Sequence, residues 1–195
     1  MNRERKLLAF GAALVAAFVL IFLLIAKKDV GPRPGPELTP VVDIEVMAFL
    51  SEARALHHET NIKEDHGDLS GAISVMNRLV LAKRPHLGKQ LPEIDEVLAD
   101  AWARVAELQL KKRDLEEAGK AVQQGLAYAP EPTYFRGHLL EVHGIVEEAR
   151  AADFADAGKK DEAEKARARA IGLLHEAVQV QEQVIGKALS DGGAR

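Results

Sequence analysis

The chain has 195 residues, with 26 basic and 30 acidic side chains and a formal net charge of −4. It has no cysteine, which excludes disulfides, thiolate metal sites and a cysteine nucleophile. Five of the basic residues and one acidic residue lie beside an apolar N-terminal run, so the remainder carries 21 basic and 29 acidic side chains, a net charge of −8. Such an acidic domain is a poor candidate for binding nucleic acid, because phosphate contacts need a basic face.

The uncharged run Leu7–Ala26 is 20 residues long. A helix of that length spans roughly 30 Å, the thickness of the hydrocarbon core of a bilayer. A cleavable export signal is the alternative, but the run exceeds the roughly 7 to 15 apolar residues of a signal core and Leu24 makes a poor cleavage context. We therefore predict an uncleaved transmembrane anchor over residues 7–26. Residues 1–6 carry three basic side chains, so we predict that this tail stays in the cytoplasm and that the domain lies across the membrane.

Residues 27–40 form a predicted linker between the anchor and a folded domain. The segment Gly31–Pro40 holds four prolines, which lack backbone donors and favour extended conformations. We expect a semi-rigid spacer, followed by a helical domain over residues 41–189 and a flexible tail over residues 190–195.

Beyond residue 41, apolar residues recur at steps of three and four, which is the spacing of amphipathic helices. Thr39 and Pro40 resemble the N-cap and first residue of the first helix, and the spacing from Asp114 to Glu117 resembles a capping box. No segment alternates with a two-residue period, so the predicted fold class is all-α. The predicted buried stripes are Val42, Val46, Phe49, Ala53 and Leu56; Leu69, Ala72, Ile73, Met76, Leu79 and Val80; Ile94, Leu98, Trp102, Val105 and Leu108; Leu115, Ala118, Val122 and Leu126; Phe135, Leu139, Val142, Val146 and Ala149; and Ala166, Ala170, Leu173, Ala177, Val180 and Val184.

Three predicted turns align with one another. Residues 67–72 read GDLSGA, residues 113–118 read RDLEEA and residues 158–163 read GKKDEA, and their final alanines are 46 and 45 residues apart. A small residue at that point lets the second helix of a hairpin press closely on the first, and Gly158 suits a helix C-terminus. The sequence therefore predicts three antiparallel helical hairpins.

One of these hairpins, over residues 99–132, resembles the tetratricopeptide repeat, and the other two match it in part. The matching residues are Trp102, Val105, Ala106, Ala118, Val122 and Pro130, at the positions where that family has W, L, G, A, F and P. The resemblance implies an α-solenoid in which the first helix of each hairpin lines a concave surface that binds peptides or protein segments. The residues that it places on that surface are Arg54, His57, Asn61, Ala103, Glu107, Leu110, Tyr134 and Glu141. The alternative is that these side chains only solvate one face of a helical bundle.

The predicted last helix allows two interpretations. Its stripe over residues 166–184 has the spacing of a coiled-coil seam, and Leu174, Val178 and Ile185 widen the stripe on one side. The helix either seals the end of the array or leaves apolar surface for a homo-oligomer. Trp102, in contrast, lies at a repeat position between Leu98 and Val105, and we predict that it packs in the core.

Catalytic and metal-binding patterns are weak. His143 and Glu147 could hold two metal ligands on one helical face, and His57, His58 and His66 lie near Asp65 and Asp68. However, the sequence has no HExxH motif, no phosphate-binding loop after a strand and no GxSxG motif. We predict no catalytic residue, no metal site and no cofactor, and we predict that the protein is not an enzyme.

Together these features predict a membrane-tethered module for protein–protein interaction or assembly. It would be an accessory or scaffolding subunit of a bacterial envelope complex, with its domain in the periplasm and membrane or envelope proteins as partners. Two alternatives remain open. One is a structural subunit that oligomerises through the anchor and the last helix, and the other is an organelle receptor that faces the cytosol.

Overall fold

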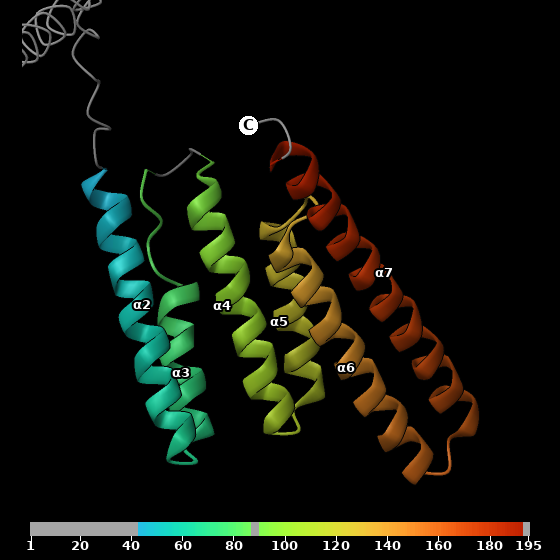
Figure 1. The fold of residues 1–195 in the computed structure, drawn as a ribbon. Coiled ribbons are helices and arrows are strands. Elements are labelled where there is room, and N and C mark those ends of the chain that lie inside the picture. The colour runs from blue at the N-terminus through green and yellow to red at the C-terminus, as the bar shows by residue number, and fades with distance from the viewer. Residues whose placement is uncertain (1–42, 87–89, 193–195) are drawn as a thin grey trace, which may run out of the picture. The chain divides into compact units, whose positions relative to one another are not determined.

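The computed structural model describes residues 43–86 and 90–192, which form six α-helices and no strand (Figure 1). The all-α prediction is confirmed for this part of the chain. None of the helices in these ranges has the length and apolar character needed to cross a bilayer. The predicted anchor and linker lie outside the described residues. The helices are α2 (Ile44–Asp65), α3 (Leu69–Val80), α4 (Pro92–Lys111), α5 (Leu115–Tyr128), α6 (Tyr134–Asp156) and α7 (Lys160–Gly192).

Local sequence signals define where most of these helices begin. The Asp68 carboxylate accepts a hydrogen bond from the Gly71 amide at 2.8 Å and so caps α3. The Thr133 hydroxyl caps α6 by accepting from the Arg136 amide at 3.2 Å. Pro92 is the first residue of α4, where its missing N–H has no consequence. α7 continues to Gly192, past the predicted boundary at residue 189.

Aspartate N-caps begin two further helices, α2 and α5. Helix α2 begins at Ile44, because Asp43 is extended and its carboxylate accepts the free amides of Glu45 and Val46 at 3.1 and 3.2 Å. Thr39 and Pro40 themselves lie outside the described residues. At α5 only half of the capping box forms. Asp114 accepts from the Glu117 amide at 3.2 Å, but its own amide donates to the Gln109 carbonyl at 2.9 Å.

The three aligned turns have the same backbone geometry. Shortly after the ends of α2, α4 and α6 comes a residue with positive φ: Gly67 (+76°), Arg113 (+66°) and Gly158 (+74°). In each turn the amide of the next residue donates to a carbonyl five positions back, from Asp68 to Lys63, from Asp114 to Gln109 and from Lys159 to Phe154, at 2.8 to 2.9 Å. This bonding satisfies carbonyls at the helix end. Arg113 adopts the conformation that glycine takes in the other two turns.

Helix α4 is the centre of the packing. It packs against α3 and α5, its neighbours in the chain, and also against α2 and α6. Figure 1 shows α2, α4 and α6 following one another across the domain, with α7 beyond α6. The contacts of α7 are with α6.

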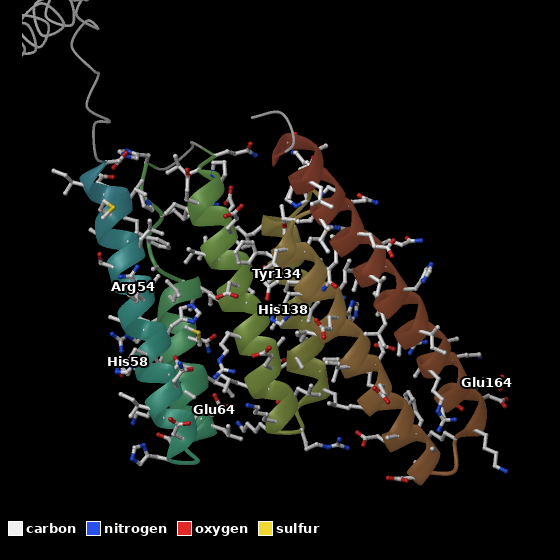
Figure 2. All side chains as sticks on the ribbon, in the orientation of Figure 1. Arg54, His58, Glu64, Tyr134, His138 and Glu164 are labelled. Carbon is white, nitrogen blue, oxygen red and sulfur yellow. The ribbon has the colours of Figure 1, made fainter. Side chains whose placement is uncertain are left out.

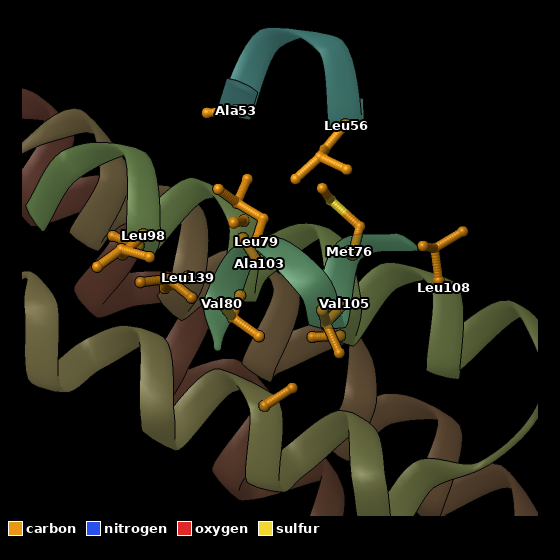
Figure 3. Close-up of a cluster of buried hydrophobic side chains, with 14 of the residues drawn as sticks. Ala53, Leu56, Met76, Leu79, Val80, Leu98, Ala103, Val105, Leu108 and Leu139 are labelled. Atoms are coloured by element: carbon orange, nitrogen blue, oxygen red, sulfur yellow. The ribbon is translucent and has the colours of Figure 1, made fainter. Parts of the chain in front are cut away.

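The core follows the predicted stripes, and Figure 3 shows its centre. Leu56 of α2 meets α3 and α4 there, and Trp102 packs against the same cluster, as predicted. Large side chains with under 2% of their surface exposed are Met76, Leu79, Ile94, Leu98, Leu108, Leu139, Val122 and Val146.

Small residues set the distance between neighbouring helices. A Cβ atom on Gly125 of α5 would lie 2.5 Å from Leu139 Cδ2 and 3.0 Å from Trp102 Cβ. A Cβ atom on Gly144 of α6 would lie 2.8 Å from Leu174 Cγ of α7. Added atoms here would have to displace these neighbours, so glycine at the two positions favours the close approach of α4, α5, α6 and α7.

A buried carboxylate joins α7 to the rest of the domain. Glu147 of α6 is 3% exposed and accepts from Arg150 Nη1 at 2.5 Å and from Arg169 Nε of α7 at 2.6 Å. Arg150 also donates to the Leu115 carbonyl of α5 at 2.9 Å. Burial by itself would raise the pKa of Glu147, but the hydrogen bonds from Arg169 and Arg150 outweigh it and hold that pKa below its usual range.

The packing at Gly125 can be tested with Gly125→Ala. Alanine has the better helix propensity, yet we expect a loss of about 1–3 kcal/mol in the free energy of unfolding, because the added methyl collides with Leu139 and Trp102. The control is Gln124→Ala, an exposed neighbour on α5, with an expected change within about 0.5 kcal/mol. Urea unfolding of both variants measures the difference. If the two variants are equally stable, Gly125 does not set the distance of α5 from Trp102 and Leu139.

The Glu147 bridge predicts a pH-dependent loss of stability in Glu147→Gln. We expect a loss of about 2–3 kcal/mol at pH 7, because two hydrogen bonds to a buried, charged acceptor are weakened. The pKa of Glu147 is lowered in the folded state, so its contribution is present above the unfolded pKa and is lost as the pH falls through the folded pKa. The gap between wild type and variant should therefore narrow in acid. Glu148→Gln, at an exposed neighbouring position, should show no such gap.

Candidate functional site

Polar side chains from α2, α4 and α6 meet on one side of the domain (Figure 2). Four α4 residues, from Asp100 to Lys111, follow steps of four, three and four residues and so share one helical face. The α6 residues from Tyr134 to Ile145 follow the same steps. We call this surface the α2–α4–α6 face. Its residues are His57, Asn61, Glu64, Asp100, Arg104, Glu107, Lys111, Tyr134, His138, Glu141 and Ile145.

Arg104 joins α2 to α4. Its Nη2 contacts the Glu64 carboxylate and donates to Asn61 Oδ1 at 3.1 Å, and its Nη1 donates to Glu107 Oε2 at 3.0 Å. Lys111 Nζ pairs with the second oxygen of Glu64. The side chains of Glu64 and Arg104 are only 16% and 21% exposed, so water screens this pair less than it would a surface ion pair.

Glu107 and His138 join α4 to α6. Glu107 Oε1 lies 3.3 Å from His138 Nε2, and Glu141 Oε2 lies 3.8 Å from His138 Nδ1. The Tyr134 ring stacks on the His138 ring, with centroids 6.3 Å apart and planes 15° apart. Tyr134 is 61% exposed. One continuous set of contacts therefore runs from α2 through α4 to α6.

The contacts shift the pKa values of the groups involved. Hydrogen bonding from Lys111, together with the charge of Arg104, lowers the pKa of Glu64. The hydrogen bond between Glu107 and His138 lowers the pKa of the carboxyl and raises the pKa of the imidazole. Burial lowers the pKa of His57, and Asp100, 3.7 Å away, opposes this only in part. The two carboxylates are thereby kept ionised and paired with cations.

Five of the eight predicted surface residues make side-chain contacts on the α2–α4–α6 face. These five are His57, Asn61, Glu107, Tyr134 and Glu141. Arg54 is exposed on α2 and Leu110 is half-buried on α4. Whether any of them binds a partner stays a prediction.

The placement of Ala103 on an open surface was wrong. Ala103 is 1% exposed and belongs to the main hydrophobic cluster. Helix α4 is packed by α2, α3, α5 and α6, so more of its circumference is buried than the repeat resemblance implies.

The sequence pattern did not identify several residues of the α2–α4–α6 face. The regular steps from Asp100 to Lys111 could have identified one polar face of α4. Nothing local could have identified the pairs, because Glu64 is 40 residues from Arg104 and 47 residues from Lys111 in sequence. The residues that were missed are Glu64, Asp100, Arg104, Lys111, His138 and Ile145.

Three of the residues considered as metal ligands, Glu147, His66 and Asp68, have other contacts. Arg150 and Arg169 bind both oxygens of Glu147, so Glu147 does not form a pair of metal ligands with His143. His66 Nδ1 lies 2.6 Å from the Ile62 carbonyl, and Asp68 caps α3. In residues 43–86 and 90–192, no three His, Cys, Asp or Glu side chains are grouped as a metal site would need.

A separate pocket lies between the start of α4 and the turn from α5 to α6. Its volume is about 360 Å³, and Arg84, Asp95, Tyr128 and Phe135 are among its lining residues. Arg84 pairs with Asp95 at 2.5 Å and lies 5.6 Å from the centroid of the Tyr128 ring. No sequence pattern indicated this pocket, because its residues come from separate segments of the chain.

The α2–α4–α6 face therefore offers ionised carboxylates, paired cations and an exposed aromatic ring across three helices. The chain matches no protein-family model, and no curated protein matches its sequence. The function is accordingly inferred from the residues of this face and from the sequence pattern.

The contact between His138 and Glu107 predicts a pH dependence for His138→Gln. Because the pKa of His138 is raised in the folded state, its stabilising contribution is complete below the unfolded pKa and is lost as the pH rises through the folded pKa. The gap in unfolding free energy between wild type and variant should therefore be larger at about pH 6 than at about pH 9. Gln124→Ala, which removes an exposed side chain of α5 with no ionisable group, is the control and should show the same gap at both values. A gap for His138→Gln that does not change with pH would contradict the pairing.

Proposed function

We propose that the protein is a membrane-tethered module that binds a segment of another protein on the α2–α4–α6 face. The observation that carries the proposal is the continuous set of side-chain contacts from Glu64 through Arg104 and Glu107 to His138. Those contacts order one polar surface built from the first helix of each of three helix pairs. Ordered side chains lose less conformational entropy when a partner binds.

The proposed architecture is a tetratricopeptide-like array of three hairpins. Three features support it: the equivalent turns at Gly67, Arg113 and Gly158, the packing of α4 on both α2 and α6, and the burial of the three aligned alanines. Ala72 and Ala118 are 0% exposed and Ala163 is 2% exposed, as expected where the two helices of a hairpin press together.

Recognition is a better fit to this face than catalysis. The lowered pKa values of Glu64 and Glu107 keep both carboxylates ionised near neutral pH, so neither is suited to act as a general acid. Both are also engaged by cationic side chains. We assign no reaction to the face.

The chemistry of the face favours a partner segment with basic and apolar side chains. Glu64, Asp100, Glu107 and Glu141 supply four carboxylates, against one guanidinium and one amino group, from Arg104 and Lys111. Tyr134 and Ile145 are 61% and 40% exposed and add apolar surface on α6. Aromatic side chains of this kind are common anchors in interfaces.

The proposed tether is the apolar run Leu7–Ala26, with the domain in the periplasm of a bacterium. Tethering raises the local concentration of the face near membrane proteins, so a modest affinity is sufficient. This suits an accessory or scaffolding subunit of an envelope complex. A reporter fused to the C-terminus tests the orientation. A signal from the cytosolic side would favour the cytosol-facing receptor.

A photo-crosslinking amino acid in place of Tyr134 tests the binding face in intact membranes. We expect a discrete adduct with another protein at this position. The same amino acid in place of Gln123, which is exposed on α5, is the control and should give none. Adding Glu141→Lys should lower the adduct yield about tenfold, since about 1.4 kcal/mol of binding free energy corresponds to that factor. Equal adducts at both positions, or none at Tyr134, would contradict the proposal.

A further inference from the structure

Helix α7 has apolar side chains on two opposite faces. The face toward α6 carries Ala166, Ala170, Ala177 and Val180, all buried. At about 100° per residue the opposite face carries a second set at steps of three and four. We call this set the outer face of α7. Its residues are Ala168, Ile171, Gly172, His175, Val178, Gln179, Glu182, Ile185, Gly186 and Leu189, and all of them are exposed.

The exposure of this face is large. Ile171, Val178, Ile185 and Leu189 are 68%, 51%, 59% and 73% exposed. A helix that only seals the end of a helical array would carry a polar outer face. Isolated exposed apolar residues are ordinary, but these four, at steps of seven, seven and four residues, lie on the same side of one helix.

Two glycines on the outer face have no role in the packing of the domain. A Cβ atom on Gly172 or Gly186 would have no atom within 4 Å, so each faces open space. Glycine within a helix lowers helix stability relative to alanine. At Gly125 and Gly144 that loss accompanies a close helix contact, whereas at Gly172 and Gly186 no contact within the described domain accounts for it.

Part of α7 also extends past its neighbour. Gly137, near the start of α6, lies against Gln181 and Val180 of α7. α7 continues beyond this point to Gly192, and residues 185–191 are all exposed. α6 therefore leaves the end of the outer face accessible on more than one side.

The order of residues on the outer face is self-complementary about the midpoint between Val178 and Gln179. His175 and Glu182 lie at equal distances on either side of this midpoint, and so do Ala168 and Leu189. Ile171 mirrors Gly186, and Gly172 mirrors Ile185. Each pair joins a large side chain to a small one, or an imidazole to a carboxylate.

From this pattern we propose that the outer face of α7 binds the α7 of a second copy of the chain, antiparallel, about a two-fold axis at Val178 and Gln179. In that arrangement each isoleucine fills the space above a glycine of the other copy, and His175 of each copy lies beside the other copy's carboxylate at position 182. A two-fold interface must be self-complementary, and this sequence order satisfies the requirement. A parallel pair would place each Glu182 beside the same residue of the other copy. The interface is one helix wide, so we expect association in about the micromolar range.

Cysteine crosslinking of the full chain in detergent tests the arrangement, since the chain has no cysteine of its own. Val178→Cys lies at the axis and should give disulfide-linked dimers. Lys187→Cys is exposed but off the outer face, and should give none. Ala168→Cys and Leu189→Cys should crosslink only when combined in one chain. The two positions are about 31 Å apart along the helix, so that link must join two copies.

Three other results would overturn the proposal. If each variant with one cysteine on the outer face forms a disulfide-linked dimer, the two helices are parallel. If Val178→Cys in membranes crosslinks to a different protein and not to a second copy of the chain, that protein binds the outer face. Sedimentation equilibrium measures the oligomeric state. If the chain is monomeric at about 100 micromolar, well above the expected dissociation constant, the outer face does not bind a second copy.

A charge exchange gives an independent measurement. His175→Glu should weaken dimerisation at least about tenfold, because it places two carboxylates together at each end of the interface. Adding Glu182→Arg should restore it, since the carboxylate introduced at position 175 of one copy would then meet the guanidinium introduced at position 182 of the other. Failure of the double variant to recover would overturn the antiparallel pairing. The adduct at Tyr134 should be unchanged in both variants, which separates this proposal from the function of the α2–α4–α6 face.

Discussion

The domain depends on close approach between helices at small residues. Gly125 lies where Trp102 of α4 and Leu139 of α6 converge, and Gly144 lies beneath Leu174 of α7. Ala72 and Ala118 act in the same way within the first two helix pairs. Helix spacing follows the size of the side chains at the contact. These few positions therefore decide how near the helices lie to one another.

The α2–α4–α6 face is a consequence of that spacing. Arg104 can reach Asn61 and Glu64 on α2 while it also donates to Glu107, and Glu107 can reach His138 on α6. The partial burial of Glu64 and Arg104 strengthens these contacts relative to surface ion pairs. Apolar packing thus orders a polar surface, and that ordered surface is what suits the proposed role in recognition.

The two long faces of α7 differ in their surroundings. Its inner face packs on α6, and the bridge from Glu147 to Arg169 fixes its position there. Its outer face keeps four apolar side chains exposed. The stripe predicted from the sequence was wider than one neighbour needs, with Val178 and Ile185 at its margin, and both lie on the exposed side. Leu174, assigned to the same margin, instead packs over Gly144.

The sequence by itself determined the helical class, the start of α3 after Asp68, the start of α6 near Pro132 and the three equivalent turns. Each depends on hydrogen bonds and side-chain periodicity within about five residues. Only the tertiary structure decided that Ala103 is buried and that Glu64 binds Arg104. The pairing and the burial depend on how each helix is rotated and which helices surround it. That rotation is set by the fit of many side chains at once, which no local pattern contains.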